Sequence, residues 1–354
     1  MYNIFESGIG FKPFIAIFAP LKLIMKKLAA LLLLLPLLTF YSCKDDIDLN
    51  ADYEDITIVY CLLDPSTDTT FMKVNKAFLG EGNVLEMARI EDSSIYKTDL
   101  SATVEQYRNS DLINTYPFDP ITVTDKEPGV FYNPNQMLYY SLMDINEDDI
   151  YRLNVRVKNK QVTAETSIIN YFSISRPSAG AAFVRIRNDE NIRSVEWSSA
   201  RNGKRYEVYI RFNFRELFAG SADTTDRFIQ WALGTKKSNT ANGGDDLSVS
   251  FTGESFFNWI EQNLPYEQER ESTVVARFTQ DLEYIIDVAD EDLNTFMEVN
   301  EPSSSVVQDK PEFTNIDNGL GIFSCRLRQT RIKKIHPETV TIIKNLEPDM
   351  KFEY

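Results

Sequence analysis

The alternation of side chains over residues 205–214 is the feature that most constrains the fold of this chain. Every second position there is apolar, namely Tyr206, Val208, Ile210, Phe212 and Phe214. Successive side chains of a β-strand point to opposite faces, whereas a helix needs apolar residues three and four positions apart. The segment therefore predicts a strand with one buried face, so partner strands have to be found elsewhere in the chain.

Residues 55–176 carry further short strand patterns, separated by turn residues and without a helical period. Strands are predicted at residues 56–63, 70–78, 102–108, 137–142, 151–157 and 162–168. The last two flank Lys158-Asn159-Lys160, which predicts a hairpin. Many short strands predict an immunoglobulin-like β-sandwich over residues 55–176.

Tyr151 opens the strand at 151–157, directly after Asp148-Asp149-Ile150. This arrangement resembles the tyrosine corner of immunoglobulin-like sandwiches, in which the tyrosine hydroxyl binds backbone a few residues upstream. The alternative is an ordinary tyrosine at the edge of the core.

A linker is predicted at residues 173–182, and a second β-rich domain over residues 181–354. Trp197, the turn Asn202-Gly203 and Tyr206 resemble the early strands of a fibronectin-type III sandwich. Trp197 is expected to pack in the core; the alternative is a platform for stacking sugars. Apolar residues at helical spacing within 255–264 and 290–299 predict short helices, so the second domain is α+β decorated.

Composition excludes some classes of function. The chain has 53 acidic residues against 37 Lys and Arg, a net charge of −16, which disfavours binding to nucleic acid. Its 43% apolar and 12% aromatic residues can build substantial cores. Besides Cys43, only Cys61 and Cys325 occur, in no metal-binding spacing. Two buried free thiols are predicted, with a disulfide between them as the alternative.

The stretch from Lys26 to Phe40 has the form of a secretion signal. Lys26 and Lys27 precede an apolar run, and no charge occurs from Leu28 to Ser42, a span of 15 residues. A transmembrane helix needs roughly 20 apolar residues, so the run is short for a permanent span. We predict a signal peptide at residues 25–42. Because residues 1–24 add a second apolar patch ahead of this signal, translation is expected to start at Met25, with 1–24 a mis-assigned extension.

The run ends at Ser42-Cys43, which resembles the lipobox of bacterial lipoproteins. The resemblance implies that Cys43 is lipidated and becomes the mature N-terminus. Lys44-Asp45-Asp46 resembles the export tag of Bacteroidota lipoproteins carried to the outer face of the outer membrane. Residues 43–54 then form an acidic tether. The alternative is a buried helix that ends in an ordinary cysteine.

Asn318-Gly319-Leu320-Gly321 predicts a sharp turn into a strand, because both glycines can adopt positive φ. In that strand Phe323, Cys325 and Leu327 are expected to face inward, and Arg326 and Arg328 outward. The surrounding stretch Thr314–Phe323 resembles the late Thr-Asn-Ile-x-Asn-Gly-x-Gly-Ile-Phe motif of a Bacteroidota surface lipoprotein family described only as a domain of unknown function. The resemblance implies a place on the cell surface beside TonB-dependent uptake machinery, and transfers no catalytic residue.

No constellation of catalytic residues emerges from the sequence, and no cofactor is predicted. His336 is the only histidine, which excludes histidine-based zinc sites. Residues 144–149 open like a calcium loop, but Asp149 occupies the place of the required glycine and Val155 that of the closing glutamate. An irregular calcium site is the alternative to no metal site.

We therefore predict a non-enzymatic lipoprotein of the outer membrane that faces the cell exterior. It would act as a binding or scaffold accessory to a TonB-dependent uptake complex, with the membrane and an outer-membrane receptor as partners and its ligand unknown. The alternatives are a surface adhesin or filament component and, from another class, a polysaccharide hydrolase with two acids converging in one cleft.

Overall fold

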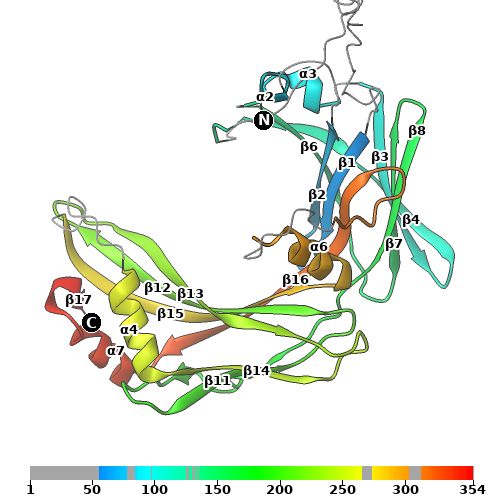
Figure 1. Cartoon of the computed structure of the whole chain (residues 1–354). Helices are drawn as coiled ribbons and strands as arrows, with labels where there is room; N and C mark the ends of the chain where they lie inside the picture. The colour runs from blue at the N-terminus through cyan, green and yellow to red at the C-terminus, as the bar shows by residue number, and fades with distance from the viewer. Residues whose placement is uncertain are drawn as a thin grey trace, which may run out of the picture. The chain divides into compact units, whose positions relative to one another are not determined.

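The computed structural model describes residues 56–77, 84–96, 98–124, 127–129, 132–133, 135–264, 273–302 and 312–353. The chain is mainly β, with 54% strand and 14% helix, as the sequence predicted. The described residues form a ten-stranded, a three-stranded and a four-stranded sheet (Figure 1). Residues 52–354 form one compact unit.

The first eight strands form a sandwich of two antiparallel sheets, the first sandwich. One sheet has the order β1-β2-β6-β5, and comprises β1 (Ile56–Leu63), β2 (Thr69–Ala77), β6 (Gln136–Leu142) and β5 (Asp119–Val123). The other has the order β4-β3-β7-β8, and comprises β4 (Asp111–Pro117), β3 (Leu100–Arg108), β7 (Ile150–Val157) and β8 (Lys160–Ser167). When the eight strands are lettered in sequence order, with β4 as C′, the sheets read A-B-E-D and C′-C-F-G. This is the arrangement of an immunoglobulin-like domain with an added strand C′.

The core of the first sandwich is built from the alternation that the sequence shows. On β7, Tyr151, Leu153 and Val155 are fully buried, while Arg152 and Arg156 are exposed. The hairpin from β7 to β8 is confirmed, and Lys158 in its turn has a φ of 52°. Core side chains from the opposite sheet are Val59, Leu63, Met72 and Val74.

Tyr151 forms the predicted tyrosine corner. Its hydroxyl accepts a hydrogen bond from the backbone N–H of Asn146 at 2.8 Å, five residues upstream. Burial raises the pKa of Tyr151, so the hydroxyl stays protonated. This hydrogen bond fixes the loop that enters β7 to the core of the sandwich.

The second sandwich follows the same plan with fewer strands. Its smaller sheet has the order β14-β11-β9, from β14 (Asp246–Thr252), β11 (Ile192–Ser198) and β9 (Ile174–Arg176). Its larger sheet has the order β13-β12-β15-β16, from β13 (Thr224–Lys237), β12 (Arg205–Phe218), β15 (Val274–Ala289) and β16 (Leu320–Ile335). The short strands β10 (Phe183–Val184) and β17 (Phe352–Glu353) pair with β16 and β15. This is the sandwich architecture of a fibronectin-type III domain.

Trp197 lies in the core of the second sandwich, not on its surface. Its side chain is 1% exposed and its ring centroid lies 5.7 Å from that of Tyr206. The hydroxyl of Tyr206 accepts a hydrogen bond from the backbone N–H of Ala200 at 2.7 Å. Core packing, rather than sugar stacking, is therefore the role of Trp197.

Helices connect and flank these strands. They are α2 (Val84–Met87), α3 (Glu91–Ser94), α4 (Gly253–Asn263), α6 (Glu291–Asn300), α7 (Pro337–Lys344) and the 3₁₀ helix η1 (Pro348–Met350). α4 begins with a capping box between Thr252 and Ser255, and buries Phe256 and Phe257. Helices were predicted where α4 and α6 occur. In the part of the chain that the structure describes, no helix is long and apolar enough to cross a membrane.

Strand β16 belongs to both sandwiches. Residues 320–325 pair with β1 in parallel, and residues 326–334 pair with β15 in antiparallel (Figure 1, orange to red). The division into domains at 55–176 and 181–354 stays a prediction. The first sheet nevertheless contains a strand segment from far along the chain, which the sequence did not predict.

This pairing brings the two cysteines onto neighbouring strands. Leu63 on β1 is the register partner of Cys325, and Cys61 that of Phe323. Both thiols are nevertheless free and buried, as predicted. Burial raises the pKa of Cys61 to about 12 and also raises that of Cys325.

The predicted turn before β16 depends on Asn318 and Gly321. Asn318 has a φ of 57° and Gly321 a φ of 113°, whereas Gly319 is not in the left-handed region. A Cβ at Gly321 would lie 2.0 Å from the carbonyl oxygen of Val59. Glycine is required here because the backbones of β16 and β1 approach so closely.

Candidate functional site

The predicted lipidation and export residues lie outside the described part of the chain. These are Cys43, Lys44, Asp45 and Asp46, together with the segments 1–24, 25–42 and 43–54. Their roles stay predictions. The candidate sites below come from the two sandwiches.

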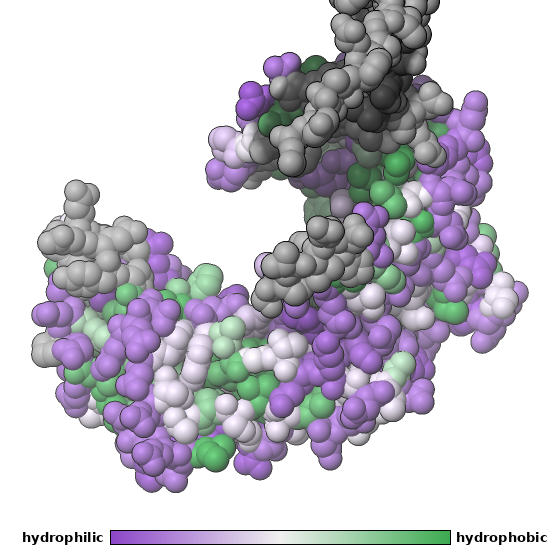
Figure 2. Space-filling view, viewed as in Figure 1, coloured by the Kyte–Doolittle hydropathy of each residue, from purple (hydrophilic) through white to green (hydrophobic). Residues whose placement is uncertain are grey.

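A cleft of about 510 Å³ lies where β16 passes from β1 to β15, and we call it the junction cleft. Its apolar lining comes from both sandwiches and from α6. The apolar residues are Leu62, Val288, Ala289, Leu293, Met297 and Leu327. The charged residues are Asp64, Arg205, Glu207, Asp287, Arg326 and Arg328. Figure 2 shows hydrophilic and hydrophobic side chains interspersed over the face of the molecule that it draws.

Strand register explains how the charged residues come together. Alternation along β12 places Arg205 and Glu207 on the face opposite the core. Glu207 is the register partner of Asp287 on β15, and Asp287 that of Arg328 on β16. Three neighbouring strands thus contribute one row of charged side chains. The sequence predicted that Arg326 and Arg328 face outward, and their side chains are 60% and 50% exposed.

Two of the three arginines are held firmly. Arg328 donates two hydrogen bonds to the carboxylate of Asp287, at 2.6 and 2.7 Å, which raises the pKa of Arg328. Arg205 binds Glu207 and Glu301, each at 2.9 Å. The hydroxyl of Tyr209 donates to Glu207 at 2.8 Å, and burial together with this bond raises the pKa of Tyr209 to about 12.

Arg326 is held by a weaker contact. Its Nε lies 3.4 Å from Oδ2 of Asp64, and its side chain is 60% exposed. Asp64 also accepts hydrogen bonds at Oδ1 from the backbone N–H and the hydroxyl of Ser66. The carboxylate of Asp64 therefore keeps two donors when Arg326 moves away.

Two neighbouring acids line the junction cleft, and both are engaged with other side chains. Glu207 and Asp287 are direct cross-strand neighbours. Arg328 binds both oxygens of Asp287, while Arg205 and Tyr209 each bind one oxygen of Glu207. Each oxygen of these two carboxylates therefore accepts one hydrogen bond from a neighbouring side chain.

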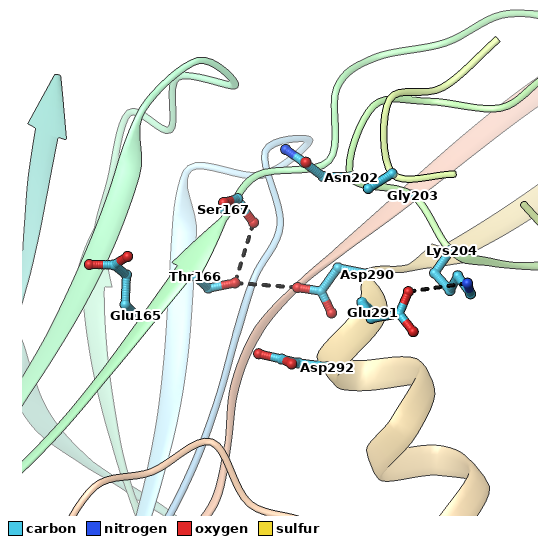
Figure 3. A pocket seen from close by; sticks show the side chains of 10 residues that line it. Glu165, Thr166, Ser167, Asn202, Gly203, Lys204, Asp290, Glu291 and Asp292 are labelled. Atoms are coloured by element: carbon cyan, nitrogen blue, oxygen red, sulfur yellow. Dashed lines mark hydrogen bonds and ion pairs between the residues drawn. The ribbon is translucent and has the colours of Figure 1, made fainter. Parts of the chain in front are cut away.

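A second, smaller pocket of about 230 Å³ surrounds Asp290 at the start of α6 (Figure 3). Glu165, Glu291 and Asp292 also line it, and Glu291 pairs with Lys204 at 3.2 Å. Figure 3 shows the Asp290 carboxylate directed at Thr166 on β8.

Asp290 is a structural residue of this pocket. It accepts hydrogen bonds from the N–H of Leu293, the N–H of Cys325 and the hydroxyls of Ser324 and Thr166. It thereby caps α6 and connects that helix with β8 and β16. Burial raises the pKa of Asp290, although these donors act in the opposite direction.

The loop at residues 144–149, which the sequence suggested as an irregular calcium site, is held by hydrogen bonds within the protein. Asp149 accepts hydrogen bonds from Gln106 and from two nitrogens of Arg108. Asn146 accepts from the backbone N–H of Asp148 at 2.9 Å. Within the described residues, no group of three or more His, Cys, Asp and Glu is arranged to hold a metal ion.

His336 caps α7. Its Nδ1 accepts from the backbone N–H of Glu338 at 3.2 Å, and its Nε2 lies 2.7 Å from a guanidinium nitrogen of Arg185. These contacts give the single histidine a role at the start of a helix.

Comparison with known proteins provides no family for this chain. No family model matches it, and no curated protein matches it. Among solved structures, the C-terminal globular domain of an oligosaccharyltransferase from Pyrococcus abyssi aligns with 60% of this chain at 10% identity and a TM-score of 0.23. The alignment covers 44% of that structure, and a likeness this weak carries no inference about function.

Sequence reasoning missed the junction cleft. Its residues come from three parts of the chain that long stretches separate: β1 with the turn after it, β12, and the later segment of β15, α6 and β16. The outward arginines of β16 were visible in the pattern, but the strands beside them were not. Register between distant strands supplies this information, and no local motif encodes it.

Proposed function

We propose that this chain is a lipid-anchored, non-enzymatic protein of the outer cell surface that binds or scaffolds, as an accessory to a TonB-dependent uptake complex. The observation that carries the proposal is the succession of Lys26-Lys27, the apolar run Leu28–Phe40, Ser42-Cys43 and the acidic residues that follow. The resemblance of Thr314–Phe323 to the family of Bacteroidota surface lipoproteins supports the same location.

Lipidation at Cys43 would provide a durable anchor. A single acyl chain holds a protein only marginally at a membrane, and stable binding takes a second chain or signal. The acidic tether after Cys43 would extend from the membrane, because its charges repel one another. The two sandwiches and the junction cleft would then be presented away from the lipid surface.

Replacing the anchoring cysteine tests the location. Cys43→Ala should transfer the protein from the membrane fraction to the soluble fraction of the producing cells, because no acyl chain can be attached. Cys61→Ala, at a buried thiol within the first sandwich, is the matched control and should leave the protein in the membrane fraction. Retention of the Cys43→Ala protein in the membrane pellet would contradict the anchor.

Cross-linking on intact cells tests the accessory role. After detergent extraction and capture through a C-terminal tag, a stoichiometric outer-membrane receptor should accompany the protein. Recovery of the protein alone, or of a polymer of itself, would count against the accessory role and favour the adhesin.

One observation favours the adhesin or filament alternative. Strand β13 spans Thr224–Lys237, 14 residues, and lies at the end of the strand order of its sheet. A long edge strand can accept a strand from another chain. Ladders of the purified, lipid-free protein in electron micrographs would support this alternative, and a monomer on size-exclusion chromatography would oppose it.

A further inference from the structure

We propose that the junction cleft binds an apolar small molecule that carries one carboxylate, with Arg326 as the residue that pairs with the carboxylate. The inference deepens the proposed binding role, on which its biological meaning rests. The experiment below measures binding in solution, and is therefore independent of where the protein is located in the cell.

The size and lining of the cleft suit a small apolar ligand. Its volume of about 510 Å³ falls in the range of small-molecule pockets, roughly 300 to 1,000 Å³. Leu62 contributes from β1, Leu327 from β16, and Leu293 and Met297 from α6. Leu327 is already buried in the core, but an apolar ligand would remove the partly exposed Leu62, Leu293 and Met297 from water.

Arg326 supplies the cation that such a ligand needs. Its contact with Asp64 is a single one of 3.4 Å, in contrast to the two-bond pairing of Arg328 with Asp287. When Arg326 turns to a ligand, Oδ1 of Asp64 retains both donors of Ser66, so the carboxylate stays hydrogen-bonded. A carboxylate can then form a charge-assisted, two-bond pair with the guanidinium group.

The other charges of the cleft favour a ligand with one anionic end. Arg205 and Arg328 are occupied by Glu207, Glu301 and Asp287. Their carboxylates would repel a second negative charge placed deeper in the cleft. The apolar part of the ligand is therefore expected to lie on the leucines and Met297, with its carboxylate at Arg326.

Straight-chain carboxylates provide the probes. The whole chain is used as Cys43→Ala, so that no attached lipid competes for an apolar cleft. Hexanoate, octanoate and decanoate are titrated by isothermal calorimetry, and affinity should rise about fourfold for each added methylene until the cleft is filled. Octanamide, which has the same length and no charge, should bind at least tenfold more weakly than octanoate.

Variants assign the two parts of the ligand to residues. Arg326→Gln should lower octanoate affinity to that of octanamide and leave octanamide itself unchanged. Met297→Trp should weaken both probes by filling the apolar floor. Arg152→Gln is the matched control: Arg152 is also a half-exposed arginine of an ion pair, but lies on β7 of the first sandwich and should change neither affinity. Thermal unfolding verifies that each variant is folded.

Equal affinities for octanoate and octanamide, or an Arg326→Gln variant that binds octanoate normally, would overturn the proposal. Absence of binding by the whole probe series would overturn it as well. If octanoate fails to bind while Cys43→Ala leaves the membrane fraction, the ligand class is wrong and the anchor stands. If octanoate binds while Cys43→Ala stays in the membrane fraction, the ligand class stands and the anchor is wrong.

Discussion

The two sandwiches share a plan but are completed differently. Each fixes an incoming loop with the hydroxyl of a buried tyrosine, Tyr151 in the first and Tyr206 in the second. The first sandwich, however, adds residues 320–325 of β16 to its sheet, more than 250 positions after β1. The second takes all its strands from residue 174 onward. The first therefore depends on a late, long-range contact, which carries a large loop-closure entropy.

A substitution at Gly321 should disrupt the pairing of β16 with β1 and have the largest effect of those considered. Gly321→Ala would place a methyl group 2.0 Å from the carbonyl oxygen of Val59, at a residue whose φ is 113°. We expect a loss of about 4 kcal/mol in the free energy of unfolding, from backbone strain and displacement of β16 from β1. Urea unfolding measures the loss, and amide hydrogen exchange should show it first in β1.

Gly220→Ala is the control for backbone strain alone. Gly220 has a φ of 77°, but nothing lies within 4 Å of the position of a Cβ. It should cost about 1 to 2 kcal/mol. If Gly321→Ala costs no more than Gly220→Ala, the contact between β16 and β1 does not stabilise the first sandwich as described.

A buried ion pair distinguishes the second sandwich. Glu216 is 0% exposed and binds Arg277 at 3.1 Å and Arg227 at 3.3 Å. Arg277 also donates to the carbonyl of Met350 at 2.9 Å, which attaches the C-terminal segment to β15. Glu216→Leu should cost about 3 kcal/mol, because it removes the fully buried carboxylate to which Arg277 and Arg227 both bind.

Glu165→Leu is the matched change in the first sandwich. Glu165 pairs with Arg152 at 2.6 Å, but both side chains are about half exposed. Solvent screening should hold its effect below about 1 kcal/mol. Chemical denaturation of both variants tests the contrast, and similar losses for the two would show that burial of Glu216 is not what gives the pair its importance.

The sequence predicted the elements of both sandwiches better than their connection. Alternation over 205–214 and 151–157 depends only on neighbouring residues, and both strands occur as predicted. The strand β16 was predicted, but its sharing between the two sandwiches was not, because its first six residues have the pattern of an ordinary part of one strand. Only pairing with β1 reveals their place, and pairing between distant strands is not encoded locally.

The same limit applies to the junction cleft. The outward position of Arg326 followed from alternation, yet its partner Asp64 lies in the turn after β1. Asp149 stood out only as the residue that breaks a calcium-loop pattern, whereas in the structure it pairs with Arg108, a residue 41 positions earlier. Residue types and alternation predicted which side chains are charged and which face outward. The ion-pair partners of these side chains depend on the tertiary fold.

Two buried aspartates should make the stability of the protein depend on pH in opposite ways. Asp149, in the first sandwich, is 2% exposed, and its hydrogen bonds to Arg108 lower its pKa. Asp290, where the sandwiches meet, is 7% exposed, and burial raises its pKa. The stabilisation from Asp149 is present above the unfolded pKa of about 3.9 and is lost as pH falls through the folded value. That from Asp290 is present below 3.9 and is lost as pH rises through the folded value.

Asparagine variants should therefore respond to pH in opposite directions. From pH 7 to pH 3.5, the stability difference between wild type and Asp149→Asn should shrink, because near pH 3.9 the unfolded wild type takes up a proton that the folded protein resists. Over the same range the free energy of unfolding of the wild type should rise relative to that of Asp290→Asn, because protonation removes a buried charge from the wild type. Each change is expected to be of the order of 1 kcal/mol, measured by urea unfolding at closely spaced pH values. If both stability differences change with pH in the same direction, the two carboxylates do not differ in environment as the structure indicates. The first sandwich and the junction would then not differ in their electrostatics.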